Sequence, residues 1–436
     1  MLRHVLADVT PLHESREFRL LYFGEFASSI GRQVTVVAVP YQVFVMTGSS
    51  LMVALVSLAQ FGPLLVTSIV GGAVADAVDR RRLLIITHFF LGCTSACFAI
   101  NAMLPSPAVW PLFVLSAITA ALYAIDAPTR NAAIPTLVSR SQLPAAYALH
   151  TIQQQASRII GPAIGGVLIA QVSLASAYWI DAGTFVVSIA ALIQMLPMKP
   201  EGGGQRMGLG SIAEGIRFLR GRPVLKATFA IDMNAMIFGL PRVLFPEFGT
   251  VVLGGDAATV GLLYAAPGAG AAVAALSSGW VSRVHRQGRA VLMAVAMWGV
   301  GITIFGLTSN MWLGLAMLAV AGAADVVSSI FRKTILQLRV PDALRGRLSG
   351  IHVAAVTGGP HLGDVEAGAV SSLTSPRFAI ASGGVASIVG LVIIHFMVPR
   401  FVHVASDDDD IVVSTTDVGP TAVADATKDR PAGRPT

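Results

Sequence analysis

Apolar runs of bilayer length alternate with short charged loops along most of the chain. In one such loop Asp76 follows Gly72 by four residues, Arg80 to Arg82 come next, and a new apolar run begins at Leu83. A helix of about 20 apolar residues crosses the ~30 Å of hydrocarbon in a bilayer. A charged cluster between two such runs is therefore a tight loop at a membrane surface.

The composition agrees with a chain that lies in lipid. Of its 436 residues, 54% are hydrophobic and 12% are charged, whereas a soluble domain carries about 25% charged residues. Strands of a membrane barrel are excluded, because they are about 10 residues long and alternate in polarity. We predict an all-α membrane protein with twelve transmembrane helices, at 18–46, 50–77, 83–104, 108–128, 146–170, 175–197, 224–248, 257–281, 290–308, 311–331, 347–372 and 378–398.

Basic residues gather in the loops on one side of these spans, which is typical of the cytoplasmic side. The set comprises Arg80, Arg81, Arg82, Arg130, Arg140, Lys199, Arg206, Arg217, Arg220, Arg222, Arg283, Arg286, Arg289, Arg332, Lys333, Arg339, Arg345 and Arg347. The net charge of +6 therefore indicates topology and not a nucleic-acid partner. We expect both termini and the loop 72–82 in the cytoplasm, with the protein in the plasma or inner membrane.

Similar segments recur in the two halves of the chain and predict an internal duplication. The run from Val53 matches the run from Val260, which aligns Asp76 with Arg283. For the linker between the halves, an interfacial helix and a disordered connection are both open. The expected order is a cytoplasmic N-terminus (1–17), a six-helix bundle (18–197), a cytoplasmic linker with an amphipathic helix (198–223), a second six-helix bundle (224–398) and a disordered cytoplasmic tail (399–436).

Twelve helices in two parallel halves, with Gly-x-x-x-Asp and a basic loop after the second helix, resemble the major facilitator superfamily. Five segments are similar to its enterobactin-exporter-like branch, which is grouped with drug:proton antiporters. They begin at Ala38 (AVPYQVFVMTGSS), Gly71 (GGAVADAVDRRRLL), Ser211 (SIAEGIRFLRGRPVL), Arg242 (RVLFP) and Gly261 (GLLYAA). The resemblance covers about residues 15–400 and implies the major facilitator fold.

In that family the loop after the second helix closes a cytoplasmic gate, where its Asp meets a helix end of the other half. The resemblance assigns this role to Gly72, Asp76, Arg80 and Arg81. We also predict that Arg80 reaches Asp126, the acid near the end of the fourth helix. The alternative is that the arginines only set the topology.

A glycine-rich turn of the fifth helix resembles the antiporter signature of the superfamily. It consists of Gly161, Pro162, Gly165 and Gly166. The family associates this signature with export. The alternative is close helix packing without directional meaning, because small residues let helices approach one another.

Ionisable residues inside a bilayer are costly, and each indicates a function. The resemblance places Glu25 and Asp232 on helices that line the central cavity. A low dielectric there favours the protonated carboxyl, which predicts proton coupling. His361 and Asp364 are three residues apart on one helix face and are further coupling candidates. The alternatives are acids at the cytoplasmic interface for the first pair and a wet polar patch for the second.

Two arginines and two aromatic residues are candidates for a substrate cavity. Arg32 departs from the branch and indicates an anionic substrate. Arg158 stands near the bilayer midplane, where it contacts either a substrate anion or a neighbouring helix. Tyr41 and Phe238 are predicted to stack on a substrate ring, with packing or lipid contact as the alternative.

The chain contains no Gly-x-x-x-x-Gly-Lys-Ser/Thr phosphate loop and no pattern typical of a zinc, haem or hydrolase site. We therefore predict no enzyme activity, no cofactor and no metal. The predicted function is that of a monomeric secondary transporter, surrounded by membrane lipids, which exports a small amphipathic molecule against proton entry. A siderophore is the first substrate candidate. The alternatives are a broad multidrug efflux pump, an importer and a membrane receptor that does not transport.

Overall fold

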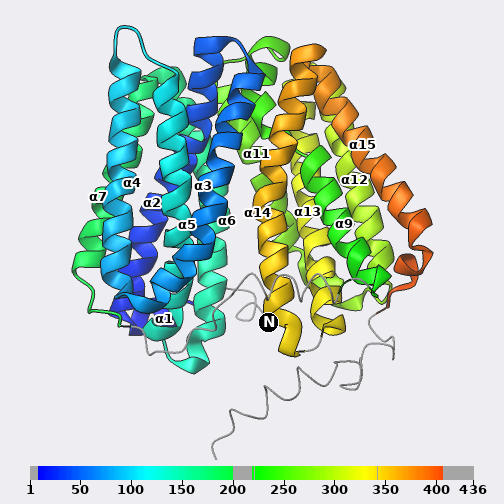
Figure 1. Cartoon of the computed structure of the whole chain (residues 1–436), viewed down its shortest axis with the longest axis horizontal. Helices are drawn as coiled ribbons and strands as arrows, with labels where there is room; N and C mark the ends of the chain where they lie inside the picture. Colours follow the sequence, from blue (N-terminus) through cyan, green and yellow to red (C-terminus); the bar gives the residue numbers. More distant parts are fainter. Residues whose placement is uncertain (1–7, 200–218, 220, 341, 406–436) are drawn as a thin grey trace, which may run out of the picture.

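Helices form every regular element that the structure describes (Figure 1). The computed structural model describes residues 8–199, 219, 221–340 and 342–405. An N-terminal group comprises α1 (Thr10–Glu14), α2 (Arg16–Thr47), α3 (Ser50–Ala77), α4 (Arg80–Met103), α5 (Trp110–Leu137), η2 (Arg140–Gln142), α6 (Leu143–Gln171) and α7 (Leu174–Ile193). A C-terminal group comprises α9 (Pro223–Phe238), η3 (Arg242–Leu244), α10 (Phe245–Glu247), η4 (Phe248–Val252), α11 (Ala257–Leu276), η5 (Ser278–Arg283), α12 (Gln287–Leu307), α13 (Met311–Arg339), α14 (Asp342–Leu373), α15 (Pro376–Met397) and η6 (Pro399–His403).

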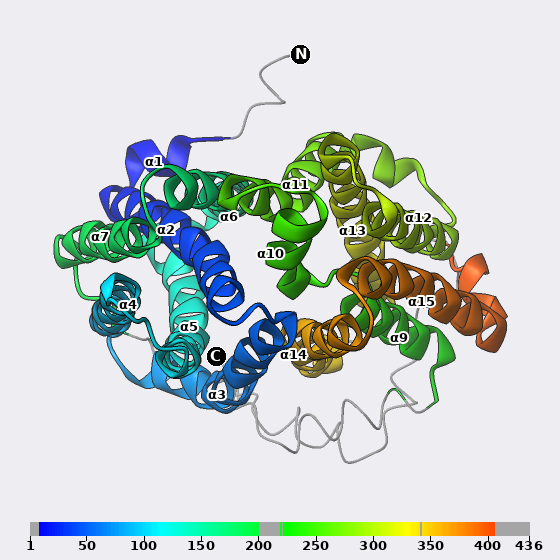
Figure 2. The same ribbon diagram turned by 90° about the horizontal axis from the view of Figure 1, so that it is seen from above.

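The two groups lie side by side and meet along two helix pairs (Figure 2). One pair is α6 with α11, and the other is α3 with α14. Nine segments of the described chain are long and apolar enough to cross a membrane. Helices α2 and α6 are as long, at 32 and 29 residues, but they are not among these nine segments. They carry the charged residues Glu25, Arg32 and Arg158. An all-α membrane protein is thus confirmed, whereas twelve spans and an internal duplication stay predictions.

Two helices continue further than the sequence predicted. Helix α5 ends at Leu137 and α13 at Arg339, beyond the predicted ends at 128 and 331. Arg130 and Arg332 consequently lie inside these helices, each 4% exposed. Their assignment to cytoplasmic loops is therefore wrong, because each guanidinium is paired with carboxylates within its own helix group.

The predicted helix at 224–248 is broken in its middle. Helix α9 ends at Phe238, and the chain continues through Gly239, Leu240 and Pro241 into the short elements η3, α10 and η4. Proline lacks a backbone N–H and disfavours helical dihedrals at the preceding residue. The indole N–H of Trp298 donates to the freed carbonyl of Gly239 at 2.8 Å. This break sets Arg242 at the start of a new element.

The predicted linker and tail fall mainly on residues outside the described ranges, namely 200–218, 220 and 406–436. The described part of the tail is ordered. Residues Pro399–His403 form η6, and Phe401 is fully buried. The carbonyl of Val404 accepts a hydrogen bond from the Gly288 N–H at 3.1 Å. The predicted disorder therefore does not extend to residues 399–405.

Small residues allow α6 to contact two helices at once. Gly161 and Gly165 pack on α2, at Gln33 and Val34. Gly166 faces the other helix group: a Cβ atom added to it would lie 2.8 Å from the Cα of Gly261 on α11. The antiporter-like turn thus serves close helix packing, as its alternative interpretation held, and its link to export stays a prediction.

The described contacts between the two groups lie towards one face of the molecule. We call the face with the turn Val78–Asp79 the loop face, and the face with the turn Gly48–Ser49 the opposite face. Gly368 lies against Ala54 near the opposite face, and Gly358 lies against Phe61 further in. At the loop end of α11, by contrast, Leu276 is 90% exposed. Within the described residues, the groups are therefore joined from mid-helix to the opposite face.

We expect Gly166→Leu to destabilise the protein, because the α6–α11 contact has no room for a side chain. Overpacking of a close contact costs about 1–3 kcal/mol, so thermal unfolding in detergent should shift to a lower temperature. Gly183→Leu on α7 is the matched control, since no atom lies within 4 Å of a Cβ added there. Equal unfolding temperatures of the two variants would contradict the packing assigned to Gly166.

Candidate functional site

Four charged or titratable side chains form a buried network between α2, α4 and α5. Arg130 donates from Nη1 to Glu25 Oε1 and, at 2.9 Å, to Asp126 Oδ2. The other oxygen of Asp126 lies 3.0 Å from His88 Nε2. All four residues are buried. We call this set, Glu25, His88, Asp126 and Arg130, the N-terminal charge network.

The local sequence explains part of this network. Asp126 and Arg130 are four residues apart on α5, so they share a helix face and can pair. Glu25 comes from α2 and His88 from α4, on neighbouring helices. A buried charge is strongly unfavourable unless it is paired and hydrogen-bonded. Removing one partner from such a pair costs about 3–5 kcal/mol, so the network ties three helices together.

The network has a chemical capacity that follows from its charges. Two carboxylates and one guanidinium leave one negative charge when His88 is neutral. One proton, taken by His88 or by a carboxyl group, brings the network to neutrality.

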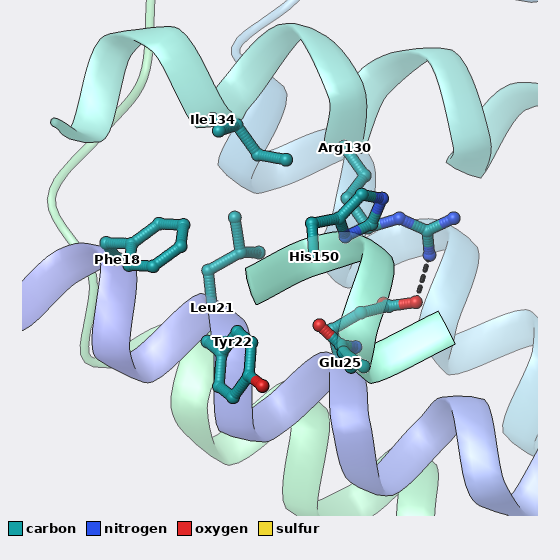
Figure 3. A pocket seen from close by; sticks show the side chains of 8 residues that line it. Phe18, Leu21, Tyr22, Glu25, Arg130, Ile134 and His150 are labelled. Carbon is teal, nitrogen blue, oxygen red and sulfur yellow. Dashed lines mark hydrogen bonds and ion pairs between the residues drawn. The ribbon is translucent and has the colours of Figure 1, made fainter. Parts of the chain in front are cut away.

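A small pocket reaches this network (Figure 3). Glu25 and Arg130 point towards one another at its end, and His150 lies beside Arg130. The remaining walls are mostly apolar. The lining residues are Phe18, Leu21, Tyr22, Glu25, Arg130, Ile134, His150 and Gln153. Glu25 and Arg130 thus border a small cavity whose other walls are mostly apolar.

The ligand atoms of Glu25, His88 and Asp126 lie within 4.8 Å of one another, as they would around a metal ion. The guanidinium of Arg130 already contacts both carboxylates. A metal cation would have to displace this cation, which the low dielectric makes costly. The donor set therefore suits a proton better than a metal.

A second charge network lies in the C-terminal group, between α9 and α13. Arg332 Nη2 lies 2.8 Å from Asp232 Oδ1 and 3.7 Å from Asp325 Oδ1. Its Nη1 donates to Ser328 Oγ at 2.9 Å. Arg332 and Asp232 are buried, whereas the side chain of Asp325 is 45% exposed. Each helix group thus holds a buried acid on its first long helix, paired with an arginine.

The arginine partners of Glu25 and Asp232 were missed in the sequence. The pattern of basic residues places Arg130 and Arg332 in loops, and His88 lies in a predicted apolar span without a predicted role. The spacing of Asp126 and Arg130 was the available signal, because a buried acid requires a cation on the same or a neighbouring face. The partners on other helices leave no such signal in the sequence.

The basic loop behaves differently from the prediction. Arg80 donates to the Ala132 carbonyl at 3.0 Å and not to Asp126, which is held by Arg130 and His88. Arg81 donates to the Leu192 carbonyl at 2.8 Å, near the C-terminus of α7, where a cation is favoured. The proposed Arg80–Asp126 contact is therefore wrong.

The gating role of Gly72 and Asp76 stays a prediction. Gly72 and Asp76 belong to α3, which continues to Ala77, but their side chains lie outside the described part of the chain. Asp79 caps the N-terminus of α4, where its side chain accepts from the Arg82 N–H at 3.0 Å. The turn between α3 and α4 is thus held by a cap and by the contacts of Arg80 and Arg81.

His361 and Asp364 connect the two helix groups. Ser57 on α3 donates from Oγ to Asp364 Oδ2 at 2.6 Å. The hydroxyl oxygen of Ser57 also lies 2.8 Å from His361 Nδ1. Nearer the opposite face, Glu247 Oε2 accepts hydrogen bonds from Ser50 on α3 and, at 3.1 Å, from Ser371 on α14. These polar contacts join α3 to the C-terminal group.

The substrate-cavity candidates occupy different environments. Arg32 lies over the ring of Tyr123, 4.8 Å from its centroid, and Arg158 is exposed in the middle of α6. Tyr41 packs against the main apolar core. Phe238 is half-buried at the end of α9. A substrate role for these residues stays a prediction.

Comparison with known proteins agrees with this architecture. The family model described as "transmembrane secretion effector" matches residues 7–423. The enterobactin exporter EntS of Escherichia coli O1:K1 is 28% identical over 394 residues, which cover 90% of this chain and 94% of that protein. The enterobactin exporter EntS of Shigella boydii serotype 18 is 29% identical over the same coverage.

Solved structures show the same fold at low sequence identity. The nucleoside transporter NupG (D323A mutant) has a TM-score of 0.70 at 13% identity, covering 87% of this chain and 98% of that chain. A bacterial homologue of the human lysosomal transporter Spinster, in an inward-facing and unoccupied conformation, has a TM-score of 0.67 at 15% identity, covering 88% and 97%. With its helical membrane architecture and a family match over nearly its whole length, the chain belongs to the transmembrane secretion effector family of major facilitator transporters.

Proposed function

We propose that this protein is a proton-coupled exporter of a small amphipathic molecule, with a siderophore as its substrate. Relatives that match over 90% of the chain are named enterobactin exporters, which supports export and this substrate class. A broad multidrug efflux pump is the alternative, because the resembling segments are shared by exporters of both kinds. Import and a receptor without transport are less consistent with relatives that carry the name of exporters.

The N-terminal charge network is the observation that carries proton coupling. In the unprotonated state Arg130 holds Glu25 and Asp126 together, and so holds α2 to α5. A proton on Glu25 removes its charge and weakens this contact. One conformation then binds the proton on Glu25 better, and another keeps the ion pair between Glu25 and Arg130. Protonation of Glu25 therefore shifts the population from the second conformation to the first. Asp232 and Arg332 form the corresponding contact in the C-terminal group.

Alternating access follows from how the helix groups meet. We assign the loop face to the cytoplasm, because the basic loops lie there, and with it both termini. The described contacts between the groups then close the outer side, and the conformation receives substrate from the cytoplasm. In this proposal two bundles of six helices rock about a central site, and Gly72 and Asp76 close the cytoplasmic side in the other conformation.

The substrate assignment is tested in a bacterial strain that makes enterobactin but lacks its own exporter. Expression of this chain should restore enterobactin in the medium and lower the amount retained in the cells. Increased tolerance to unrelated drugs, with no change in the amount of enterobactin exported, would instead favour the multidrug alternative.

We expect Glu25→Gln to abolish proton coupling while the protein still folds. Glutamine keeps a hydrogen-bonding oxygen for Arg130 but cannot take up the proton, and Arg130 remains paired with Asp126. In everted membrane vesicles, substrate-induced proton movement should fall at least tenfold, the scale of a lost proton-transfer group. Substrate exchange without net proton movement should persist.

Glu366→Gln on α14 is the matched control for this variant. Glu366 is half-buried and forms no hydrogen bond or ion pair within the described residues. Its replacement should leave proton movement at the level of the unchanged protein. Normal proton movement in Glu25→Gln would exclude Glu25 as the coupling group.

We expect Glu247→Ala to open the outer side more often. The variant loses the acceptor that joins Ser50 to Ser371, and hydrogen bonds to a charged group contribute about 1.5–3 kcal/mol. The conformational equilibrium should shift by about tenfold. The measurement is maleimide labelling of Ala54→Cys from outside, since Ala54 is fully buried in the contact between α3 and α14.

This labelling requires a background without the two exposed native cysteines, Cys93 and Cys97, each replaced by serine. Glu366→Ala serves as the control and should leave labelling of position 54 slow. Unchanged labelling in Glu247→Ala would show that the Glu247 contacts do not hold the outer side closed.

A further inference from the structure

Two titratable side chains lie in the contact between α3 and α14, where the helix groups meet (Figure 2). Gly358 and Gly368 of α14 pack directly against side chains of α3. His361 and Asp364 stand between these glycines on the same helix face, because residues three or four apart are neighbours on a helix surface. A polar pair therefore occupies a stripe of α14 that packs on the other helix group.

Ser57 of α3 joins this pair through a single hydroxyl group. Its Oγ donates to Asp364 Oδ2 at 2.6 Å and lies 2.8 Å from His361 Nδ1. A serine hydroxyl has one hydrogen, and Asp364 receives it. The contact with His361 therefore requires that Nδ1 carries a hydrogen and donates it to Ser57. We call Ser57, His361 and Asp364 the inter-group triad.

The triad can take up one proton and keep both of its hydrogen bonds. With a neutral His361 and an ionised Asp364 it carries one negative charge. A proton on His361 Nε2 leaves both hydrogen bonds as they are. A proton on Asp364 reverses them, so that the carboxyl group donates to Ser57 and Ser57 donates to the bare Nδ1 of the other tautomer. In either case the triad becomes neutral and still joins the two helices.

The surroundings of the triad make its negative charge unfavourable. Ser57 is buried, and His361 and Asp364 are half-buried. The ring of Phe61 lies over the imidazole of His361, with ring centroids 5.9 Å apart. Within the described residues, Asp364 forms no ion pair. Burying an unpaired charge costs more than one hydrogen bond to it returns, so the contact is more stable when the triad is neutral.

The other charged groups around the triad do not reverse this preference. Arg242 on η3 is the cation that acts on Asp364, together with the Val243 backbone, and Tyr264 on α11 acts on it as well. Arg242 is exposed, and both elements belong to the same helix group as Asp364, so they remain beside it when the groups separate. The remaining titratable side chains of α14 and of the elements packed on it lie towards helix ends, on another face of α14 or against other partners. They are Asp76, Lys226, Asp232, Glu247, Asp342, Arg345, Arg347, His352, Glu366, Arg377 and His395.

We propose that the inter-group triad binds one proton from the outer side and, when protonated, holds that side closed. Without the proton, its negative charge is better hydrated once α3 and α14 have separated, so the outer side opens more often. This inference rests on the proposed alternating access and deepens it. Glu25 lies within one helix group, whereas the triad places a second proton site across the contact that must open.

The test is the pH dependence of outer-side opening in the full chain, purified in neutral detergent without substrate. The measurement is maleimide labelling of Ala54→Cys in the background that lacks Cys93 and Cys97. Each rate is divided by that of Ser106→Cys, an exposed position between α4 and α5, because thiol reactivity itself depends on pH. Release of one proton on opening shifts an equilibrium by up to about tenfold per pH unit. The labelling ratio should therefore rise about tenfold or more from about pH 5.5 to about pH 8.5, either side of the ordinary histidine range.

Asp364→Asn distinguishes a proton site from a contact that is only structural. Asparagine keeps an oxygen that can accept from Ser57 but carries no charge, so the labelling ratio should stay low at every pH. The loss of a purely structural contact would instead raise the ratio at every pH. Glu366→Gln on the same helix is the matched control, since Glu366 forms no hydrogen bond or ion pair within the described residues. It should keep the pH dependence of the unchanged protein.

Glu25→Gln separates this site from the N-terminal charge network and needs no change in the triad. The variant should keep the pH dependence of labelling while it loses substrate-induced proton movement. A ratio that does not rise with pH in the unchanged protein or in Glu25→Gln would overturn the triad as a proton site. A raised ratio or an unchanged pH dependence in Asp364→Asn would overturn it as well. Failure of enterobactin export would reject the proposed function and leave these labelling results standing, because they are obtained without substrate.

Discussion

The burial of Arg130 between two carboxylates is the interaction on which the N-terminal group depends. Burying a guanidinium or a carboxylate alone in a low dielectric is strongly unfavourable, whereas burying the two as a hydrogen-bonded pair costs much less. Arg130 therefore fixes the depth of α5 against α2, and it places Asp126 where His88 can reach it. In the proposed coupling, a proton on Glu25 weakens the same contact that holds α2 to α5. The atoms that hold these helices together would then also be the ones that respond to the proton.

Contacts between the helix groups are of another kind. They combine glycine-to-backbone packing, as between Gly166 and Gly261, with hydrogen bonds from serine hydroxyls to Glu247 and Asp364. Such contacts bury no ion pair, so separating the groups on this side costs less than opening either charge network. In the proposed alternating access, each group would therefore move largely as a unit, with α3 and α14 parting before Arg130 or Arg332 loses its partners.

The sequence predicted the helices more successfully than their polar contacts. The end of α3 at Ala77 and the start of α9 at Pro223 agree within a residue with the apolar runs, because hydrophobic length is a local property. Arg130 was misplaced because the positive-inside rule counts charges along the chain and takes no account of its pairing with Glu25 on α2 and Asp126 on α5. The break at Pro241 had a local signal in proline itself, but hydropathy alone does not record it.

The two charge networks differ in how far solvent reaches them. In the N-terminal network all four side chains are buried, and the cation lies between two acids. In the C-terminal network Arg332 and Asp232 are buried, but the side chain of Asp325, 3.7 Å from the same guanidinium, is 45% exposed. An exposed charge contributes less to an ion pair than a buried one, so Asp232 is the acid that chiefly holds α9 to α13.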